Sequence, residues 1–247
     1  MNAPRATLAA AATAVLLWLT PALAGPPYTT DDPEPVDYQH WEFYLASQHF
    51  VTRDAATGTA PHVEVNYGVL PDVQLHAIAP VAYARSGGGP TFFGPGDIEL
   101  GTKVRFVQEG DWCPMVGTFP HVELPVGDAT RGLGAGHLQT FIPVWLQKSF
   151  GPWTTYGGGG YWVNRGDGHR DYWSIGWLVQ RRVSDLAAVG TEVFYTTPDH
   201  VGGGANLEFN VGLILDLSEH HHLLVSAGRG IIGDNRFQAY AAYQLTL

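Results

Sequence analysis

The sequence predicts an all-β protein, an antiparallel transmembrane β-barrel of about 12 strands. Three observations predict this fold: polar and apolar residues alternate with a period of two over many segments, an export signal precedes them, and short connections alternate with long ones. Residues 97–106 show the alternation plainly. Ile98, Leu100, Val104 and Phe106 share one face, and Asp97, Glu99, Lys103 and Arg105 share the other. Such a strand meets water on one side only.

The composition is that of a folded protein, with 45% hydrophobic and 15% charged residues. A net charge of -10 with only 13 Lys and Arg residues argues against a nucleic-acid partner, because phosphate binding requires a basic stripe. The tryptophans need either burial or a membrane interface. Those near or within expected strands are Trp41, Trp145, Trp153, Trp162, Trp173 and Trp177. The sequence leaves open which of them form an interfacial girdle and which pack inside.

Residues 1–24 have the pattern of a cleaved signal peptide. Arg5 precedes an apolar run from Leu8 to Leu19, and the small residues Ala22 and Ala24 favour cleavage before Gly25. A retained transmembrane helix is the alternative, but this run is shorter than the roughly 20 residues that a helix needs to span a bilayer. No second apolar run in residues 25–247 has spanning length. Any insertion into a membrane is therefore expected to use strands.

Residues 25–39 form a polar, proline-rich lead without a periodic apolar face. Its prolines are Pro26, Pro27, Pro33 and Pro35, and its acidic residues are Asp31, Asp32, Glu34 and Asp37. The lead could extend freely or fold into the lumen of a barrel. Its composition favours the first interpretation, a solvated terminal tail.

The period-two pattern recurs throughout residues 40–247, which we expect to form the barrel. The expected strands span 40–45, 62–69, 73–84, 97–106, 115–125, 137–148, 153–164, 171–182, 187–198, 205–217, 222–230 and 236–247. Most have about ten residues, the length that crosses a bilayer when a strand is tilted. Pro80, Pro120 and Pro143 each remove a ladder donor and predict bulges or gaps. The glycine run 157–160 predicts a kink or bulge, or else a close approach by a ligand or by the lead.

The connections fall into two sets. The mostly tight ones are 70–72, 108–114, 149–152, 183–186 and 218–221, whereas longer glycine-rich ones include 86–96, 126–136 and 164–170. Outer-membrane barrels have this asymmetry, with short periplasmic turns and longer outer loops. An even strand number returns the C-terminus to the periplasmic side. Ending on Leu247 rather than on an aromatic residue departs from a common feature of such proteins.

Many half-wet strands together with an export signal favour a closed barrel with lipid outside over a soluble sandwich. Closure removes the strand edges whose unpaired backbone groups hydrocarbon cannot solvate. We therefore expect an outer-membrane location, membrane lipid as a partner and a monomeric protein.

The polar faces then define candidate residues that line the lumen and bind a solute. They are Glu42, His62, Glu64, Asp97, Glu99, Lys103, Arg105, His121, Glu123, Glu192, Asn206, Glu208, Asn210 and Asp216, with His76 beside them. Acids outnumber bases, which disfavours an anion pore. Interleaved apolar side chains that could line a path for an aromatic solute are Phe119, Phe141, Trp145, Phe194 and Tyr240. In the alternative, Lys103 and Arg105 pair with acids across strands and plug the interior, since barrels of this size lie between filled and open ones.

The sequence offers little support for catalysis or for a metal. His220, His221 and His222 are adjacent in a strand or turn, where neighbouring side chains diverge, so we expect solvated histidines. The single Cys113 excludes an internal disulfide and is expected to be a buried or idle thiol. His222 and Ser226 share a face but are about 13 Å apart at strand rise, and no Gly-x-Ser-x-Gly motif occurs. We expect no cofactor, no metal and no enzymatic activity.

Four segments resemble a known family. They are 27–33 (PYTTDDP), 96–106 (GDIELGTKVRF), 123–128 (ELPVGD) and 217–230 (LSEHHHLLVSAGRG). They are similar to segments of the family named for the MetA pathway of phenol degradation, and the resemblance spans nearly all of residues 25–247. It implies an outer-membrane barrel with an uptake role and supplies no catalytic residues. The expected function is a transporter or channel for small aromatic or hydrophobic solutes. The alternatives are a non-conducting surface barrel and, third, a barrel enzyme that acts on lipids.

Overall fold

The computed structural model describes residues 26–247. The signal peptide expected at residues 1–24 lies outside this described part. The strands are β1 (Trp41–Val51), β2 (Ala55–Leu70), β3 (Val73–Ser86), β4 (Phe92–Pro95), β5 (Ile98–Val107), β6 (Met115–Thr118), β7 (His121–Leu124), β8 (Gln139–Phe150), β9 (Trp153–Asn164), β10 (Tyr172–Ser184), β11 (Ala187–Thr196), β12 (Asn206–Asp216), β13 (His221–Ile232) and β14 (Phe237–Thr246). One short 3₁₀ helix, η1 (Ala129–Arg131), interrupts a loop.

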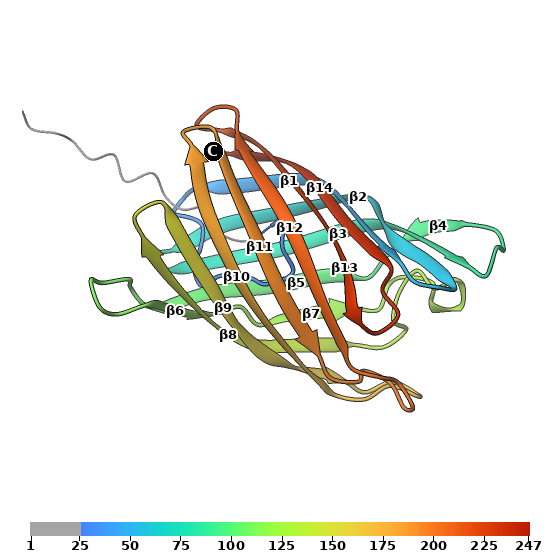
Figure 1. The fold of residues 1–247 in the computed structure, drawn as a ribbon. Coiled ribbons are helices and arrows are strands. Elements are labelled where there is room, and N and C mark those ends of the chain that lie inside the picture. Colours follow the sequence, from blue (N-terminus) through green and yellow to red (C-terminus); the bar gives the residue numbers. More distant parts are fainter. Residues whose placement is uncertain (1–25) are drawn as a thin grey trace, which may run out of the picture.

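These strands close into a single antiparallel barrel (Figure 1). The ring closes where β1 pairs with β14, from Glu42 opposite Thr246 to Val51 opposite Phe237. β6 and β7 both pair with β5 and β8, so they are two halves of one wall strand. β4 pairs only with the end of β3 and extends beyond the ring. The wall therefore has 12 strands, which confirms the predicted fold class.

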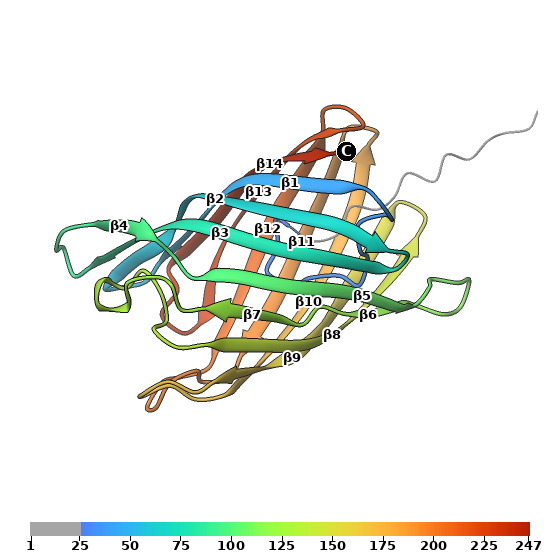
Figure 2. The ribbon, with the colours of Figure 1, turned by 180° about the vertical axis from the view of Figure 1, so that it is seen from behind.

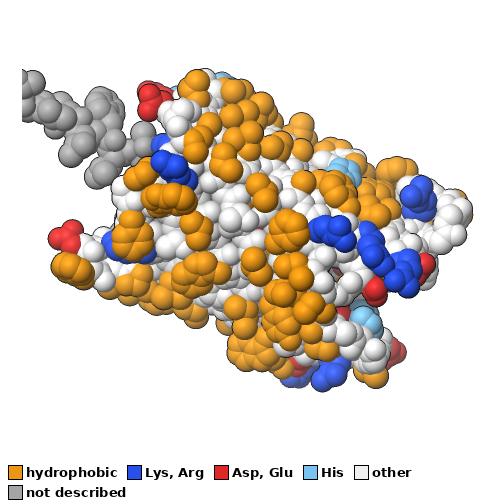
Figure 3. Space-filling view, viewed as in Figure 1, with side chains coloured by type: hydrophobic (Ala, Val, Ile, Leu, Met, Phe, Trp, Pro, Cys, Tyr) orange, Lys and Arg blue, Asp and Glu red, His pale blue; other side chains and the backbone are white. Residues whose placement is uncertain are grey.

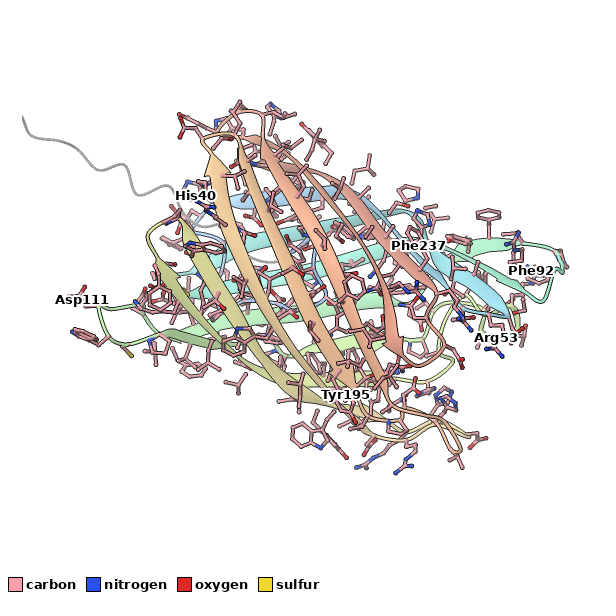
Figure 4. All side chains as sticks on the ribbon, viewed as in Figure 1. His40, Arg53, Phe92, Asp111, Tyr195 and Phe237 are labelled. Atoms are coloured by element: carbon pink, nitrogen blue, oxygen red, sulfur yellow. The ribbon has the colours of Figure 1, made fainter. Side chains whose placement is uncertain are left out.

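The barrel has two different ends. The start of β1 and the end of β14 lie at one end, together with the turns 71–72, 108–114, 151–152, 185–186 and 217–220. We call this the turn end. The opposite end, called the loop end, carries 52–54, 87–97, 125–138, 165–171, 197–205 and 233–236. In Figure 4 the labelled His40 and Asp111 lie at the turn end, and Arg53 and Phe92 at the loop end.

The first hairpin is longer than the sequence pattern predicts. β1 continues to Val51 and β2 begins at Ala55, so only three residues connect them at the loop end. Pro61 explains the misreading, because β2 shifts register between Thr59 and His62 and the alternation loses its phase there. Figure 2 shows β4 and the connection that precedes it reaching past the rest of the loop end.

The outer face of the wall is apolar and the inner face is polar. Outward side chains such as Leu75, Leu100 and Val211 are 46%, 43% and 50% exposed, whereas inward Gln74, Lys103 and Asn210 are at most 5% exposed. Figure 3 shows hydrophobic side chains spread over the outside of the strands. A water-soluble protein has the opposite arrangement, so the outer face is suited to lipid.

The structure also settles the positions of the tryptophans. Trp145 is 3% exposed and points inward. Trp162 also points inward, because it pairs with the inward Phe141. The outward ones are Trp41, Trp153, Trp173 and Trp177. Trp41 and Trp153 lie near the turn end and Trp173 near the loop end. Only part of the tryptophan set can therefore belong to interfacial girdles.

The proline predictions hold, but the glycine-run prediction does not. Pro120 separates β6 from β7, and Pro143 lies across from this gap in the ladder. By contrast, residues 157–160 pair with β8 and β10 without a register shift. The glycines there make room for neighbouring rings, since a Cβ at position 157 would lie 2.5 Å from the Trp177 ring and one at position 160 would lie 2.7 Å from the Phe141 ring.

Candidate functional site: the lumen and its inner strap

Residues 26–37 lie inside the barrel, so the favoured interpretation of a solvated tail was wrong. The lead runs along the inner wall from β13 to β3, as the blue trace within the barrel in Figure 1 shows. Thr30 is 1% exposed and Asp32 is not exposed at all. We call residues 26–37 the strap. It was missed because its partners are far away in the sequence: Pro27 contacts a residue 199 positions later.

The first part of the strap is held by β11 and β13. Ser226 Oγ donates a hydrogen bond of 2.6 Å to the carbonyl oxygen of Pro27. The Glu192 carboxylate accepts hydrogen bonds from the backbone N–H groups of Thr29, at 2.8 Å, and Thr30, at 2.7 Å. Asn210 Nδ2 donates to the same carboxylate at 2.6 Å. Glu192 is only 1% exposed, so these donors replace the water that a buried carboxylate requires.

The middle of the strap forms ion pairs with β5. Lys103 Nζ lies 3.0 Å from Asp31 Oδ1 and 3.5 Å from Asp32 Oδ2. Lys103 therefore does not pair with acids across strands, as the plugged-barrel alternative supposed. Arg105 pairs mainly with Asp72 in the first turn, at 2.6 Å.

The last part of the strap returns to the wall near the turn end. Gln147 Nε2 donates to Glu34 at 3.1 Å, and the backbone N–H of Val36 donates to Gln74 Oε1 at 2.8 Å. Just beyond the strap, Tyr38 forms an isolated parallel bridge with Gly68. The chain then enters β1.

Glycines in the wall create the space in which the strap lies. Gly190 and Gly212 are opposite each other on β11 and β12, and Tyr28 packs over both. A Cβ at position 190 would lie 2.4 Å from the Tyr28 hydroxyl, and one at position 212 would lie 2.6 Å from its ring. Further contacts of the same kind join Thr30 to Gly176, Pro33 to Gly117 and Asp37 to Gly68.

A cavity of about 530 Å³ opens at the turn end and reaches the middle of the barrel. The strap forms one side, while β1, β2, β3 and β5 supply much of the rest. Its carboxylates are Asp31, Glu34, Asp37, Glu42, Glu64, Asp185, Asp216 and Glu219, against two permanent cations, Lys103 and Arg182. The carboxylates outnumber these cations and give the cavity a negative electrostatic potential when its histidines are neutral. Such a potential favours neutral or cationic solutes over anions.

Three of the lumen candidates, Glu64, Glu99 and His121, form one polar network with His76 and Asn66 beside the cavity. His76 Nδ1 lies 2.6 Å from Asn66 Oδ1 and 3.6 Å from Glu64, and His76 Nε2 lies 3.0 Å from Glu99. His121 Nδ1 lies 3.7 Å from the same Glu99 carboxylate. Five side chains on β2, β3, β5 and β7 are thus linked across the wall.

The other candidates are distributed along the lumen and do not form one site. Glu42 accepts a hydrogen bond from Tyr44, His62 contacts Thr59, and Asp216 pairs with Arg182 and His222. Toward the loop end, Glu123 lies opposite Glu99, and Asn206 and Glu208 contact Thr196 and Asn235. Whether any of the fourteen binds a solute stays a prediction.

Asp97 organises the loop end rather than the cavity. Its carboxylate accepts hydrogen bonds from the backbone N–H groups of Gly127, at 2.9 Å, and Ala135, at 2.7 Å. Both belong to the loop 125–138, whose Leu133 is buried against Ala82 and Ala84 on the inner face of β3. Asp97 thereby holds this loop inward over the lumen.

A continuous series of aromatic rings leads from the cavity toward the loop end. Phe119, which lines the cavity, lies 5.3 Å from the His121 ring, and His121 lies 5.3 Å from both Phe141 and Trp162. Phe141 and Trp162 stack at 4.7 Å. Trp162 also stacks on Tyr172 at 5.7 Å. We call these five rings the aromatic ladder.

The ladder shares only part of its membership with the sequence prediction. Phe119 and Phe141 were expected, and Trp145 packs beside them. Trp162 and Tyr172 were missed as path residues, although each falls on the inward period of its strand. Phe194 and Tyr240 point inward from β11 and β14, where Tyr240 packs against an apolar cluster around Tyr44 and Ile214.

The remaining reactive residues are engaged elsewhere. His222 contacts Asp216 and Ser226 holds the strap, so the two do not contact each other. His221 faces the other way, toward Tyr243. Within residues 26–247, no group of three or more His, Cys, Asp and Glu side chains is arranged to hold a metal ion. Cys113 is exposed in the turn 108–114. Of the two expectations for this thiol, buried or idle, the first was therefore wrong.

Solved structures with similar folds are outer-membrane barrels. The COG4313 outer membrane channel from Pseudomonas putida F1 has a TM-score of 0.72 at 14% sequence identity, over 87% of this chain and 98% of that one. The fold is that of an outer-membrane barrel. The KdgM porin in complex with oligogalacturonate has a TM-score of 0.54 at 7% identity, over 82% and 98% of the two chains. The translocator domain of the autotransporter NalP from Neisseria meningitidis has a TM-score of 0.51 at 8% identity, over 84% and 86%.

Comparisons by sequence add no family. No protein-family model and no curated protein matches this chain. The structural similarity at such low identity establishes the fold alone.

Proposed function

We propose that the protein is a monomeric outer-membrane channel through which small aromatic or hydrophobic solutes pass. The observation that carries this proposal is the aromatic ladder, because it continues from a cavity of about 530 Å³ along the inner side of the wall toward the loop end. Stacked rings offer an aromatic solute successive contacts without a deep binding site.

Three further observations support the location, and two more support the solute class. The outer face is apolar, the N-terminal pattern is that of an export signal, and similar folds occur in an outer membrane channel and in a porin. Four segments resemble the family named for a pathway of phenol degradation. The excess of carboxylates in the cavity disfavours organic anions.

The proposal is tested with the full-length mature protein in planar bilayers. We expect discrete ion currents that phenol blocks in a concentration-dependent way, because a ring bound on the ladder narrows the path. In Trp162→Ala the phenol concentration for half block should rise about threefold to tenfold, the value of about one aromatic contact. Trp173→Ala is the matched control, since Trp173 faces outward and is 52% exposed.

A second candidate function is a non-conducting surface barrel, and the presence of the strap in the lumen is the observation that favours it. The same recordings separate the two candidates. Absence of current together with absence of solute uptake in vesicles would overturn the channel proposal. If phenol blocked Trp162→Ala and Trp173→Ala at equal concentrations, the aromatic ladder would not be the path of the solute.

A further inference from the structure

The seat of the strap is a built binding site for an extended acidic peptide. It combines a buried carboxylate that receives backbone N–H groups, a buried ammonium group that receives two carboxylates, and glycines that admit side chains. Each part of the strap meets a complementary part of the wall. The structure thus contains a peptide ligand, supplied by its own chain, in a site formed by β2, β3, β5, β6, β8 and β10 to β13.

The barrel does not depend on the strap for its own hydrogen bonds. The wall ladder closes from β1 to β14 and from β3 to β5 without it. The polar strap contacts above are between a strap group and a wall side chain, and the bridge at Tyr38 lies outside the strap. Departure of the strap would therefore leave the wall intact.

The groups that the strap covers can be hydrated when it leaves. Lys103 borders the cavity, which opens at the turn end. Glu192 binds Thr30, the strap residue next to Asp31, so removal of the strap would extend this opening to Glu192. Water in the emptied lumen would replace the lost partners of both groups, so the emptied state avoids the full cost of buried unpaired charges. The strap is joined to the wall at the turn end through residues 38–40, which gives it a natural pivot.

We propose that the strap is a releasable, self-supplied ligand of the inner wall, and that its departure from the seat toward the turn end opens the lumen. This adds regulation to the channel function. Its first test measures release directly and does not require that the barrel conducts.

Release is measured by thiol labelling of full-length Thr30→Cys protein in which Cys113 is replaced by serine. Thr30 is 1% exposed in the seat, so a maleimide can react with a cysteine there only after the strap has left. We expect slow but complete labelling of the folded protein. Labelling of the urea-unfolded protein gives the rate for a free thiol.

Lys103→Met should speed this labelling by about tenfold or more, because it leaves Asp32 without its counterion in the seat. Lys103→Arg keeps the charge and should label nearly as slowly as the parent. Arg182→Met is the matched control: it breaks another lumen ion pair, with Asp216 at 2.8 Å, that does not involve the strap. Heat-modifiable migration on gels shows that each variant retains the barrel.

A disulfide tests whether release opens the path. A Cβ at position 176 would lie 3.1 Å from the Thr30 Cβ, so Thr30→Cys with Gly176→Cys can join the strap to β10 with a small adjustment. We expect the oxidised protein to carry less current than the same protein after reduction, and to resist labelling.

Two results would overturn the proposal. The first is that folded Thr30→Cys protein stays unlabelled both with and without Lys103→Met, or that Lys103→Met labels no faster than Arg182→Met. The second is that the oxidised and reduced double-cysteine proteins conduct equally. If no form conducts, the channel proposal fails and the labelling rates alone decide whether the strap is released.

Discussion

At the scale of single residues, Tyr28 shows how the wall and the strap are fitted to each other. Glycine within a strand costs stability, because it adds backbone freedom to the unfolded chain and contributes no side chain to packing. Gly190 and Gly212 nevertheless lie side by side on β11 and β12. The space above them is filled by the Tyr28 ring. Their cost is therefore offset by a contact that belongs to the strap.

Gly212→Ala should displace Tyr28 and loosen the first part of the strap. The new methyl group would overlap the ring, whose atoms lie 2.6 to 2.7 Å from the ideal Cβ position. We expect hydrogen exchange at the Thr29 and Thr30 amides, which are bonded to Glu192, to accelerate about tenfold. Exchange measured by mass spectrometry on peptides covering residues 26–39 checks this.

Gly204→Ala is the control for this experiment, since a Cβ at position 204 meets no atom within 4 Å. Its strap peptides should exchange as in the parent protein. Unchanged exchange in Gly212→Ala would show that Tyr28 is not held by these glycines.

At the scale of elements, the strand divided into β6 and β7 illustrates how a ladder gap is repaired. Pro120 cannot donate a backbone hydrogen bond, and the pairing with β8 stops on either side of it. The Thr118 hydroxyl bridges the gap by donating a hydrogen bond of 2.6 Å to the Pro143 carbonyl. One side chain thus satisfies an acceptor that the ladder leaves free.

Thr118→Val keeps the shape of the side chain and removes this donor. We expect the free energy of unfolding to fall by about 1 kcal/mol, the typical contribution of such a hydrogen bond. Thr102→Val on β5 is the comparison, because Thr102 pairs with the outward Leu75 and so lies on the lipid-facing side. A urea titration in detergent that ranks both variants equally would contradict this role for Thr118.

The loop 125–138 depends on one carboxylate, that of Asp97, the residue just before β5. Asp97→Ala removes the acceptor for the amides of Gly127 and Ala135, so the loop should lose its inward position. Arg131 lies in this loop and is a trypsin site. We expect cleavage after Arg131 to accelerate about tenfold, since proteolysis follows local opening. Mass spectrometry of the fragments checks the position, and cleavage at the parental rate would refute the anchoring role.

At the scale of the whole molecule, the sequence predicts the wall better than the contents. Side-chain alternation is a local property, so residues 97–106 reveal two faces without knowledge of any neighbour. The strap has no such pattern. Thr30 and Glu192 are 162 positions apart, and only closure of the barrel brings them together. The aromatic ladder was predictable only in part. The sequence shows that Trp162 and Tyr172 fall on the inward faces of their strands, but their stacking depends on the register of β9 and β10.

The last prediction concerns the environment of the whole barrel. Val211 is 50% exposed in the middle of β12, and Val201 is 72% exposed in the loop 197–205. If lipid surrounds the strands, Val211→Arg places a charge in hydrocarbon and should lower folding stability by about 2 to 4 kcal/mol, whereas Val201→Arg should change it by less than about 1 kcal/mol. Guanidinium titrations of folding into lipid vesicles measure both variants. Equal stability would mean that the middle of β12 lies in water, and the apolar outer face would then need another partner.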